Sequence, residues 1–320
     1  MRRWLVLLLL LFSFGSAIAR PRSSEISASP LALDPGDPAN YLLGRLRYLQ
    51  GWVLASNDPA FGGLSSLAIR GDHILALSDT GLIYSFDRDG ARFSRLSGVP
   101  LRDRSGALAI NKTDRDTESM TLSPDGMQLW IGLERRNAIW RYGDPAAAAE
   151  ASAAPAAMKK WPGNAGPETL VRLHDGRFLV LSEEADGPDG ADDTHDALLF
   201  DRDPTDPAAT AIRFGYRPPA GFDATDAAEL PDGRVLVINR RFSPLDGFAA
   251  AVTVIDPGAI APGGVLVGEE IARLAPPLSV DNMEGLAVTQ EAGRTIVWLV
   301  SDDNFSPLER TLLMKFALTP

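Results

Sequence analysis

Cysteine is absent from the 320 residues, and histidine occurs only three times. A chain without cysteine has no disulfide framework and no cysteine for lipid attachment. His73, His174 and His195 lack the spacing of a zinc pair, and no HExxH motif occurs. Neither a Gly-x-Ser-x-Gly elbow nor a Walker loop is present, so the sequence indicates neither a serine hydrolase nor a P-loop enzyme.

Basic residues are scarce as well. The 31 lysines and arginines are outnumbered by 42 aspartates and glutamates, which gives a formal net charge of −11. The sequence has no basic stripe for a phosphate backbone, so nucleic acid is excluded as a partner. With 45% hydrophobic and 23% charged residues, the composition is that of a globular protein with a sizeable core.

Long apolar runs are also missing, except at the N-terminus. Residues 4–14 form an apolar stretch after Arg2 and Arg3, and Ala17 and Ala19 follow it. This pattern is typical of a signal peptide over residues 1–19, cleaved after Ala19, and the stretch is short for a membrane span. We therefore expect a periplasmic or secreted monomer without a membrane span after cleavage, with a flexible segment at residues 20–40 and one domain at residues 41–320.

Five segments of the chain resemble one another. Each consists of a short strand, a turn with glycine, an apolar strand and a polar cluster; the segments are residues 62–86, 116–142, 166–187, 223–244 and 281–307. Asp-Gly between alternating apolar residues favours a hairpin, because glycine accepts the positive φ of the turn. The spacing of about 50 to 59 residues predicts a β-propeller, with a β-sandwich as the alternative.

The last of these units lacks an outer strand. Fourth strands are indicated at residues 210–217 and 269–277, but nothing comparable follows Phe316. Residues 45–56 can supply the missing strand by pairing beside residues 309–318, which closes the ring and leaves no free edge. The fold class predicted is therefore all-β, a β-propeller of five repeats in five or six blades. The Ala/Pro-rich residues 143–163 are expected to form a surface loop.

Acidic residues recur at matched places around the hairpin turns. Glu118 lies eight residues before Gly126, and Glu134 lies eight residues after it. The corresponding pairs in the other units are Glu168 and Glu183, Asp226 and Arg240, Glu284 and Asp302, and Ser65 and Asp79. Because the first strand of each propeller unit lines the axis, we expect these side chains to face one mouth of a central channel.

Clustered carboxylates repel one another unless a cation lies among them, and oxygen ligands suit Ca²⁺. We therefore predict a Ca²⁺ cofactor whose ligands are Glu118, Glu134, Glu183, Asp79 and Asp303. The expected catalytic residues are Glu284, Asp302 and Glu168. The expected binding residues for a small anionic or ester substrate are Arg240, Arg241 and Asn304, since a guanidinium holds phosphate or carboxylate in a bidentate manner. The acidic loop 183–193 is a candidate second ion site.

Other interpretations of the acidic mouth stay open at this point. Strand ends meet water in any propeller, so a solvated rim also explains the ring. Arg240 is also explained as an ion-pair partner of Asp226 or of a neighbouring glutamate. A metal-dependent hydrolase of phosphoesters or other esters, a non-catalytic propeller that binds a ligand or protein, and a lactonase-like Ca²⁺ propeller all fit the pattern.

Several motifs resemble those of the bacterial phytase-like family, which is also described as having esterase-like activity of phytase. They are FGGLSSLAI, LSDTGLIYSF, GPETLVRLHDGRFLVLSEE, DNMEGLAV and VSDDNFSPLERTLLMKF, and the resemblance covers roughly residues 45–318. It implies an exported β-propeller and a Ca²⁺-dependent phosphoester hydrolase. The lysine pattern of β-propeller phytases is not matched, because the only adjacent lysines are Lys159 and Lys160 in the Ala/Pro-rich segment. Phytate is therefore not indicated as the substrate.

Overall fold

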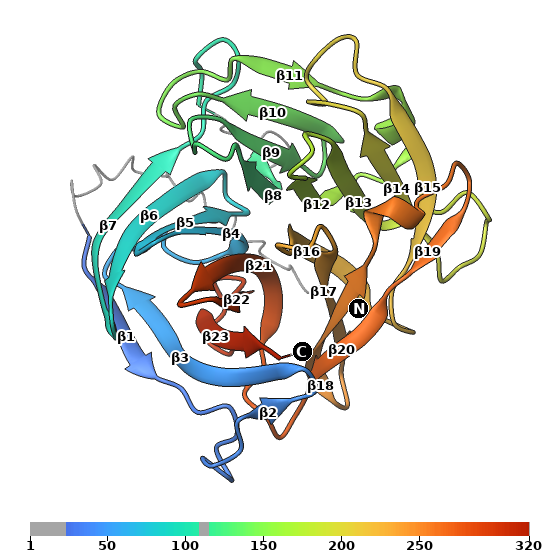
Figure 1. Cartoon of the computed structure of the whole chain (residues 1–320). Coiled ribbons are helices and arrows are strands. Elements are labelled where there is room, and N and C mark those ends of the chain that lie inside the picture. The colour runs from blue at the N-terminus through green and yellow to red at the C-terminus, as the bar shows by residue number, and fades with distance from the viewer. Residues whose placement is uncertain (1–23, 109–114, 320) are drawn as a thin grey trace, which may run out of the picture.

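Five β-sheets surround one axis in the computed structural model, which describes residues 24–108 and 115–319 (Figure 1). The predicted all-β propeller is thus confirmed, and the described residues form five blades. The predicted signal peptide, residues 1–19, lies outside the described residues. No helix in the described part of the chain has the length and apolar character that crossing a bilayer requires.

The first four blades follow one another along the chain, apart from one strand of blade 3 that comes from within the segment of blade 4. Blade 1 contains β4 (Leu64–Arg70), β5 (His73–Ser78), β6 (Leu82–Asp89) and β7 (Arg92–Pro100). Blade 2 contains β8 (Thr117–Leu122), β9 (Leu129–Leu133), β10 (Ala138–Tyr142) and β11 (Ala151–Ala153). Blade 3 contains β12 (Pro167–Arg172), β13 (Phe178–Asp186), β14 (His195–Phe200), β15 (Ala211–Arg217) and β19 (Val265–Val267). Blade 4 contains β16 (Asp223–Glu229), β17 (Val235–Ser243), β18 (Gly247–Ile255) and β20 (Glu269–Leu274).

Blade 5 joins the two ends of the described chain. It contains β21 (Asn282–Glu291), β22 (Arg294–Asp302), β23 (Leu312–Leu318), β3 (Leu46–Ser56) and β1 (Ile26–Pro30), and β2 (Leu42–Leu43) pairs with β3. β3 runs antiparallel to β23, with Leu46 opposite Leu318 and Val53 opposite Leu312. The predicted closure of the ring by the N-terminal strand is confirmed.

The hydrophobic core is divided into layers between neighbouring blades. Leu77 of blade 1 packs with Ile131 of blade 2, and Trp130 of blade 2 packs with Phe178 of blade 3. Separate clusters of the same kind join blade 3 to blade 4, blade 4 to blade 5, and blade 5 to blade 1. Both faces of each sheet are therefore buried, and polar residues are left at the strand ends and turns.

The turns between the first and second strands follow the predicted chemistry. Gly126, Gly176 and Gly233 have φ values of 74°, 91° and 86°, a region that favours glycine. The preceding aspartate in each turn accepts a hydrogen bond from the backbone N–H two residues later, at 3.0, 3.0 and 3.1 Å. These turns lie at the far end of each hairpin from the acidic residues.

Two segments differ from expectation. Within residues 143–163, expected as a surface loop, β11 completes blade 2 and a 3₁₀ turn at Ala156–Lys160 places Met158 in the core. Pairing with β10 holds β11 in place, and Trp161 anchors the segment by donating from Nε1 to Asp196 Oδ2 at 2.8 Å. Within residues 20–40, expected to be flexible, β1 pairs with β3 along its whole length. A second 3₁₀ turn spans Pro257–Ala259.

Candidate functional site

The innermost strand of every blade carries an irregularity at the same place. The pairing register of β4, β8, β12, β16 and β21 with the next strand shifts by one residue near the start of the strand. The residues left out of the ladder are Ser65, Glu118, Glu168, Thr225 and Glu284. A bulge of this kind re-aims a side chain, and three of the five bulges carry a glutamate.

Residues at or just after the C-terminal ends of the second strands contribute the other side chains of the site. A pocket of about 390 Å³ lies at this mouth of the channel. It is lined by Asp79, Asp116, Glu118, Glu134, Glu168, Glu183, Arg240, Phe242, Phe248, Asn282, Glu284, Asp302 and Asn304. Eight carboxylates thus share the lining with a single arginine. The structure brings together nine of the eleven predicted site residues, and Arg241 and Asp303 are the exceptions.

Two groups of carboxylates have the spacing of a metal site. Asp116, Glu118 and Glu134 form one group in blade 2, and Glu134 joins Glu168 and Glu183 of blade 3 in the other. Within each group the oxygen atoms lie within 4.8 Å of one another. Asp116 is also paired with Arg135, which partly neutralises it. Glu134 is common to both groups, so a cation bound between the two blades would contact it.

Burial in this pocket makes ionisation of the acids unfavourable. Burial raises the pKa of Glu118 and of Glu168 well above the usual range of a glutamate, and repulsion from neighbouring glutamates raises both further. The pKa of Asp302 rises to about 8, again chiefly through burial, although the Asn304 N–H donates to its Oδ1. Because most of these charges repel one another, the pocket favours a positive ligand.

Arg240 supplies the positive charge that the lining does contain. Its Nη2 donates to Glu183 Oε1 at 2.8 Å, and its Nε lies 3.0 Å from Glu284 Oε1. The carboxylate of Glu284 first, and then that of Glu183, holds the pKa of Arg240 above its usual range. Pairing with a neighbouring glutamate was one of the two interpretations of Arg240, and the ion pairs agree with it. The partners are Glu183 and Glu284, and Asp226 is not among them.

Arg241 points away from the pocket. Successive residues of a strand face opposite sides of the sheet, so Arg240 and Arg241 cannot both face the channel. The guanidinium of Arg241 lies 5.0 Å from the centroid of the buried Phe222 ring, and that of Arg273 lies 4.7 Å from it. Arg241 therefore stacks within the blade, and its predicted role in substrate binding has no geometric support.

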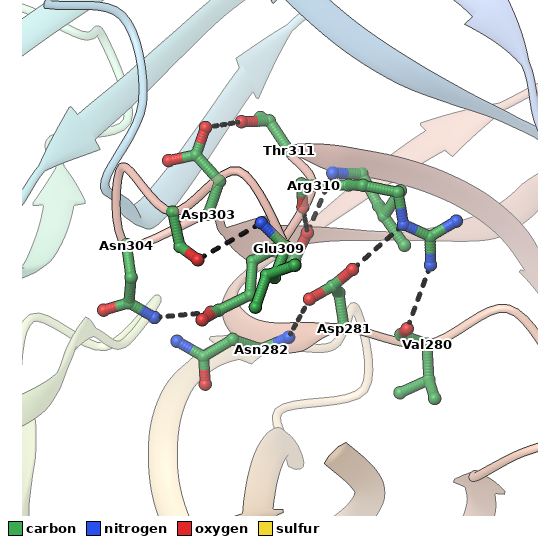
Figure 2. A network of polar contacts seen from close by, with 12 residues as sticks. Val280, Asp281, Asn282, Asp303, Asn304, Glu309, Arg310 and Thr311 are labelled. Atoms are coloured by element: carbon green, nitrogen blue, oxygen red, sulfur yellow. Dashed lines mark hydrogen bonds and ion pairs between the residues drawn. The ribbon is translucent and has the colours of Figure 1, made fainter. Parts of the chain in front are cut away.

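The residues of the run Asp302-Asp303-Asn304 have different roles, and Figure 2 shows Asp303 hydrogen-bonded to Thr311 and Asn304 hydrogen-bonded to Glu309. Asp302 and Asn304 line the pocket, whereas Asp303 accepts hydrogen bonds from the Gly63 N–H at 3.0 Å and from Thr311 Oγ1 at 2.9 Å. These bonds fix the loop before β23 to the start of blade 1. Asp303 was predicted as a metal ligand, but its carboxylate is occupied by these donors.

Asp226, predicted to belong to the ring, lies inside the channel. It accepts from Ser66 Oγ at 3.0 Å, from the Leu286 N–H at 2.9 Å and from the Ala227 N–H at 2.8 Å. Burial raises the pKa of Asp226 well above its usual range. Thr225 holds the bulge position in β16, so Asp226, the next residue, ties blades 1, 4 and 5 together and takes no part in the pocket.

The proposed second ion site in loop 183–193 has a different organisation. Asp189 and Asp193 pair with Arg217, at 3.3 and 3.2 Å respectively. Both carboxylate groups with metal spacing in the described residues lie at the pocket mouth. These two aspartates thus neutralise an arginine of β15.

The sequence argument missed four pocket residues. Asp116, Asn282 and Phe242 each stand two residues from a predicted one, namely Glu118, Glu284 and Arg240. The two-residue period of a strand is the signal that would have found them. Phe248 faces Phe242 across the β17–β18 ladder, a pairing that follows only from the register.

Comparison with solved structures gives distant likenesses of the whole fold. An α-L-arabinofuranosidase from Podospora anserina has a TM-score of 0.48 at 9% identity, covering 92% of this chain and 98% of that chain. The glutaminyl cyclase of Myxococcus xanthus has a TM-score of 0.47 at 12% identity, covering 87% of this chain and 100% of that chain. The hydrazine synthase of Kuenenia stuttgartiensis has a TM-score of 0.42 at 12% identity, covering 78% and 79%. None of these likenesses indicates a function for this chain.

Comparison with protein families gives a definite result. None of the curated proteins matches the chain. The model of the phytase-like family, described as "esterase-like activity of phytase", matches residues 59–305. This range runs from the residues before β4 to the loop after β22, and it includes all five bulges of the innermost strands. The chain therefore belongs to the phytase-like family.

Proposed function

We propose that the acidic pocket binds Ca²⁺ and hydrolyses an ester, with phosphoesters as the first candidates. The observation that carries the proposal is the convergence of eight carboxylates from four blades on one pocket that contains a single arginine. The description of the family supports ester hydrolysis. Export to the periplasm or beyond is part of the proposal and rests on the sequence of residues 1–19.

The donor set fits a hard divalent cation. Ca²⁺ takes six to eight oxygen ligands, and the lining offers many carboxylate oxygens but neither a thiolate nor an imidazole. Glu118, Glu134, Glu168 and Glu183 would hold the ion, because they belong to the two groups with suitable spacing, whose fifth member, Asp116, is paired with Arg135. Asp79 lies on the same mouth and is a further candidate ligand. When bound, Ca²⁺ would polarise the phosphoryl group and offset its negative charge.

Glu284 and Asp302 of blade 5 are the candidates for proton transfer. Burial raises the pKa of Glu284, and the Arg240 guanidinium beside it opposes this rise by favouring the carboxylate, so Glu284 is the candidate base. In the proposed reaction, Glu284 takes the proton of a water as the water oxygen bonds to phosphorus. Asp302, whose pKa of about 8 keeps it protonated at neutral pH, gives its proton to the alcohol oxygen as the P–O bond breaks. Glu168, which belongs to the second group of carboxylates, would help to orient the ester.

A ligand-binding protein without catalysis is the second candidate. Arg240 is already bound by Glu183 and Glu284, so it contributes less to anion capture than a free arginine would. A pocket of this kind still binds a cation, and the cation in turn holds an anionic ligand. This alternative shares the metal and lacks the turnover.

Activity and melting measurements separate these functions. Phosphoesters, carboxyl esters and lactones are offered to the protein in excess Ca²⁺ and in EDTA. We expect phosphoester turnover only with Ca²⁺, and a melting temperature that Ca²⁺ raises by several degrees, because the ion binds only the folded state. Glu168→Gln is expected to reduce both effects. Glu269→Gln, an exposed acid on the outer strand β20, is the control and should change neither.

Each contrary outcome has a distinct meaning. A Ca²⁺-dependent melting temperature without turnover of any ester supports the ligand-binding alternative. Turnover of lactones alone would mean that the substrate is a lactone and not a phosphoester. Identical melting temperatures in Ca²⁺ and EDTA refute the metal site and leave a solvated acidic rim.

A further inference from the structure

Two phenylalanines interrupt the polar lining of the pocket. Phe242 and Phe248 are the apolar side chains among the described residues that line it, and both belong to the β17–β18 hairpin of blade 4. Their rings lie 4.9 Å apart between centroids and are tilted by 51°. The acidic mouth therefore has one aromatic side, on the hairpin that carries Arg240.

The strand geometry directs both rings to the pocket. Phe242 stands two residues after Arg240, so the two side chains lie on the same face of β17. Phe242 and Phe248 are direct partners in the β17–β18 ladder, so Phe248 shares that face. The ladder continues past them to the pair Ser243 and Gly247, which extends the hairpin beyond the level of Arg240.

Packing within the protein does not explain this arrangement. The core of the fold leaves Phe242 56% exposed as a residue, although a phenylalanine contributes most to stability when it is fully buried. The residue on the other face, Arg241, covers the buried Phe222 instead. An exposed ring packed on a half-buried one beside a polar pocket is typical of a binding site, because a ring offers a large rigid surface with little entropy to lose.

We propose that Phe242 and Phe248 form an aromatic subsite that receives a planar apolar group of the substrate. This inference rests on the proposed function and names its substrate class: a monoester that joins one anionic group to an aromatic alcohol. The anionic group enters among the carboxylates with the cation, and the ring lies against the phenylalanines. A polyanion has no apolar group for this wall, and the surplus of carboxylates disfavours its additional charges.

The test compares two phosphomonoesters whose alcohols have similar acidity, benzyl phosphate and ethyl phosphate, so that chemical reactivity differs little between them. In Ca²⁺, wild-type protein should have a kcat/KM for the benzyl ester roughly tenfold above that for the ethyl ester. Phe242→Ala should lower the benzyl value by a similar factor and leave the ethyl value within about twofold. Phe242→Tyr keeps the ring and should keep the preference.

Leu245→Ala is the matched control. Leu245 lies at the tip of the same hairpin and is 95% exposed, but it does not line the pocket. Its substitution should change neither ester. Melting temperatures of the variants show whether a loss reflects the hairpin's stability, since a cross-strand aromatic pair also contributes to folding. Equal kcat/KM values for both esters in the wild-type protein, or the same values in Phe242→Ala, refute the subsite and leave the hydrolase proposal intact.

A binding measurement keeps the two proposals distinct when neither ester is hydrolysed. Benzylphosphonate and ethylphosphonate lack the cleavable P–O–C link, and their affinity in Ca²⁺ is measured by titration calorimetry. Tighter binding of benzylphosphonate that is lost in Phe242→Ala supports the subsite even if the protein is no enzyme. Equal binding of the two phosphonates, or no binding of either, overturns it.

Discussion

Replacing Asp302 with asparagine should flatten the pH dependence of stability in the metal-free protein. Asp302 is 7% exposed, and its pKa rises to about 8 in the folded state, chiefly through burial. Asparagine has nearly the same shape and keeps the acceptor for the Asn304 N–H, which donates to Asp302 Oδ1 at 2.6 Å. The substitution therefore removes the titration and preserves most of the packing.

The sign and size follow from linkage. The unfolded chain loses the proton of Asp302 near the ordinary aspartate value of 3.8, whereas the folded protein keeps it up to about pH 8. The folded state thus binds more protons in this window, so the free energy of unfolding falls as the pH rises. At about 1.36 kcal/mol for each pH unit, the contribution of Asp302 falls by about 4 kcal/mol between pH 5 and pH 8.

Urea unfolding in EDTA, followed by circular dichroism at pH 5 and pH 8, measures this difference. Between pH 5 and pH 8 the stability of the wild-type protein should fall by about 4 kcal/mol relative to that of Asp302→Asn. The variant should already be the more stable protein at pH 5, because the unfolded wild-type chain is ionised there. Glu269→Gln, on the exposed outer strand β20, should follow the wild-type protein at both values. If the two stability profiles of wild type and Asp302→Asn run parallel, burial does not raise the pKa of Asp302 and the electrostatic description of the pocket is wrong.

Three further predictions concern the ion pair, the channel and the ring. Arg240→Ala should lower the free energy of unfolding by roughly 3 kcal/mol, measured by urea unfolding without metal, because Glu183 and Glu284 lose their partner. Unchanged stability with lost turnover would instead indicate that Arg240 contacts the substrate. Asp226→Ala should also lower the free energy of unfolding by about 3 kcal/mol, because it leaves three buried donors without an acceptor. The activity of each folded molecule should stay the same, and a selective loss of activity would place Asp226 in the site. Deleting residues 24–56 should abolish the cooperative thermal transition, because β23 then ends in a free edge; a cooperative melt of the shortened chain would contradict the closure argument.

The sequence determined the fold more completely than the site. Asp-Gly turns recur at nearly constant spacing, and a turn imposes its φ requirement locally, so both turns and blades could be predicted without the structure. The closure by residues 45–56 followed from counting strands. The outer strand β11 was not predicted, because its three residues are alanine and serine, which have no strand preference of their own. It forms a strand only by pairing with β10.

For the site, the residue types were visible but their directions were not. Every innermost strand has the same bulge, and in β16 the bulge position is held by Thr225, so Asp226 comes one residue too late and lies inside the channel. Side chains alternate between the two faces of β17, which places Arg240 and Arg241 on opposite faces. This could be predicted from the sequence only if the strand were known to extend as far as Arg241. The roles of Asp302 and Asp303 depend on a loop held by Thr311 and Gly63, which no local pattern specifies.

The pairing of β3 with β23 joins two strands that are synthesised at different times. β3 leaves the ribosome early and β23 leaves it after all the other strands, so β3 waits without its partner while every blade between them is synthesised. Contacts between such distant segments form slowly, since a long loop must close first. We expect a chain that stops before Leu312 to display the unpaired edges of both β3 and β22, which the complete ring conceals. A protease that recognises exposed strands would therefore remove incomplete chains and spare finished ones.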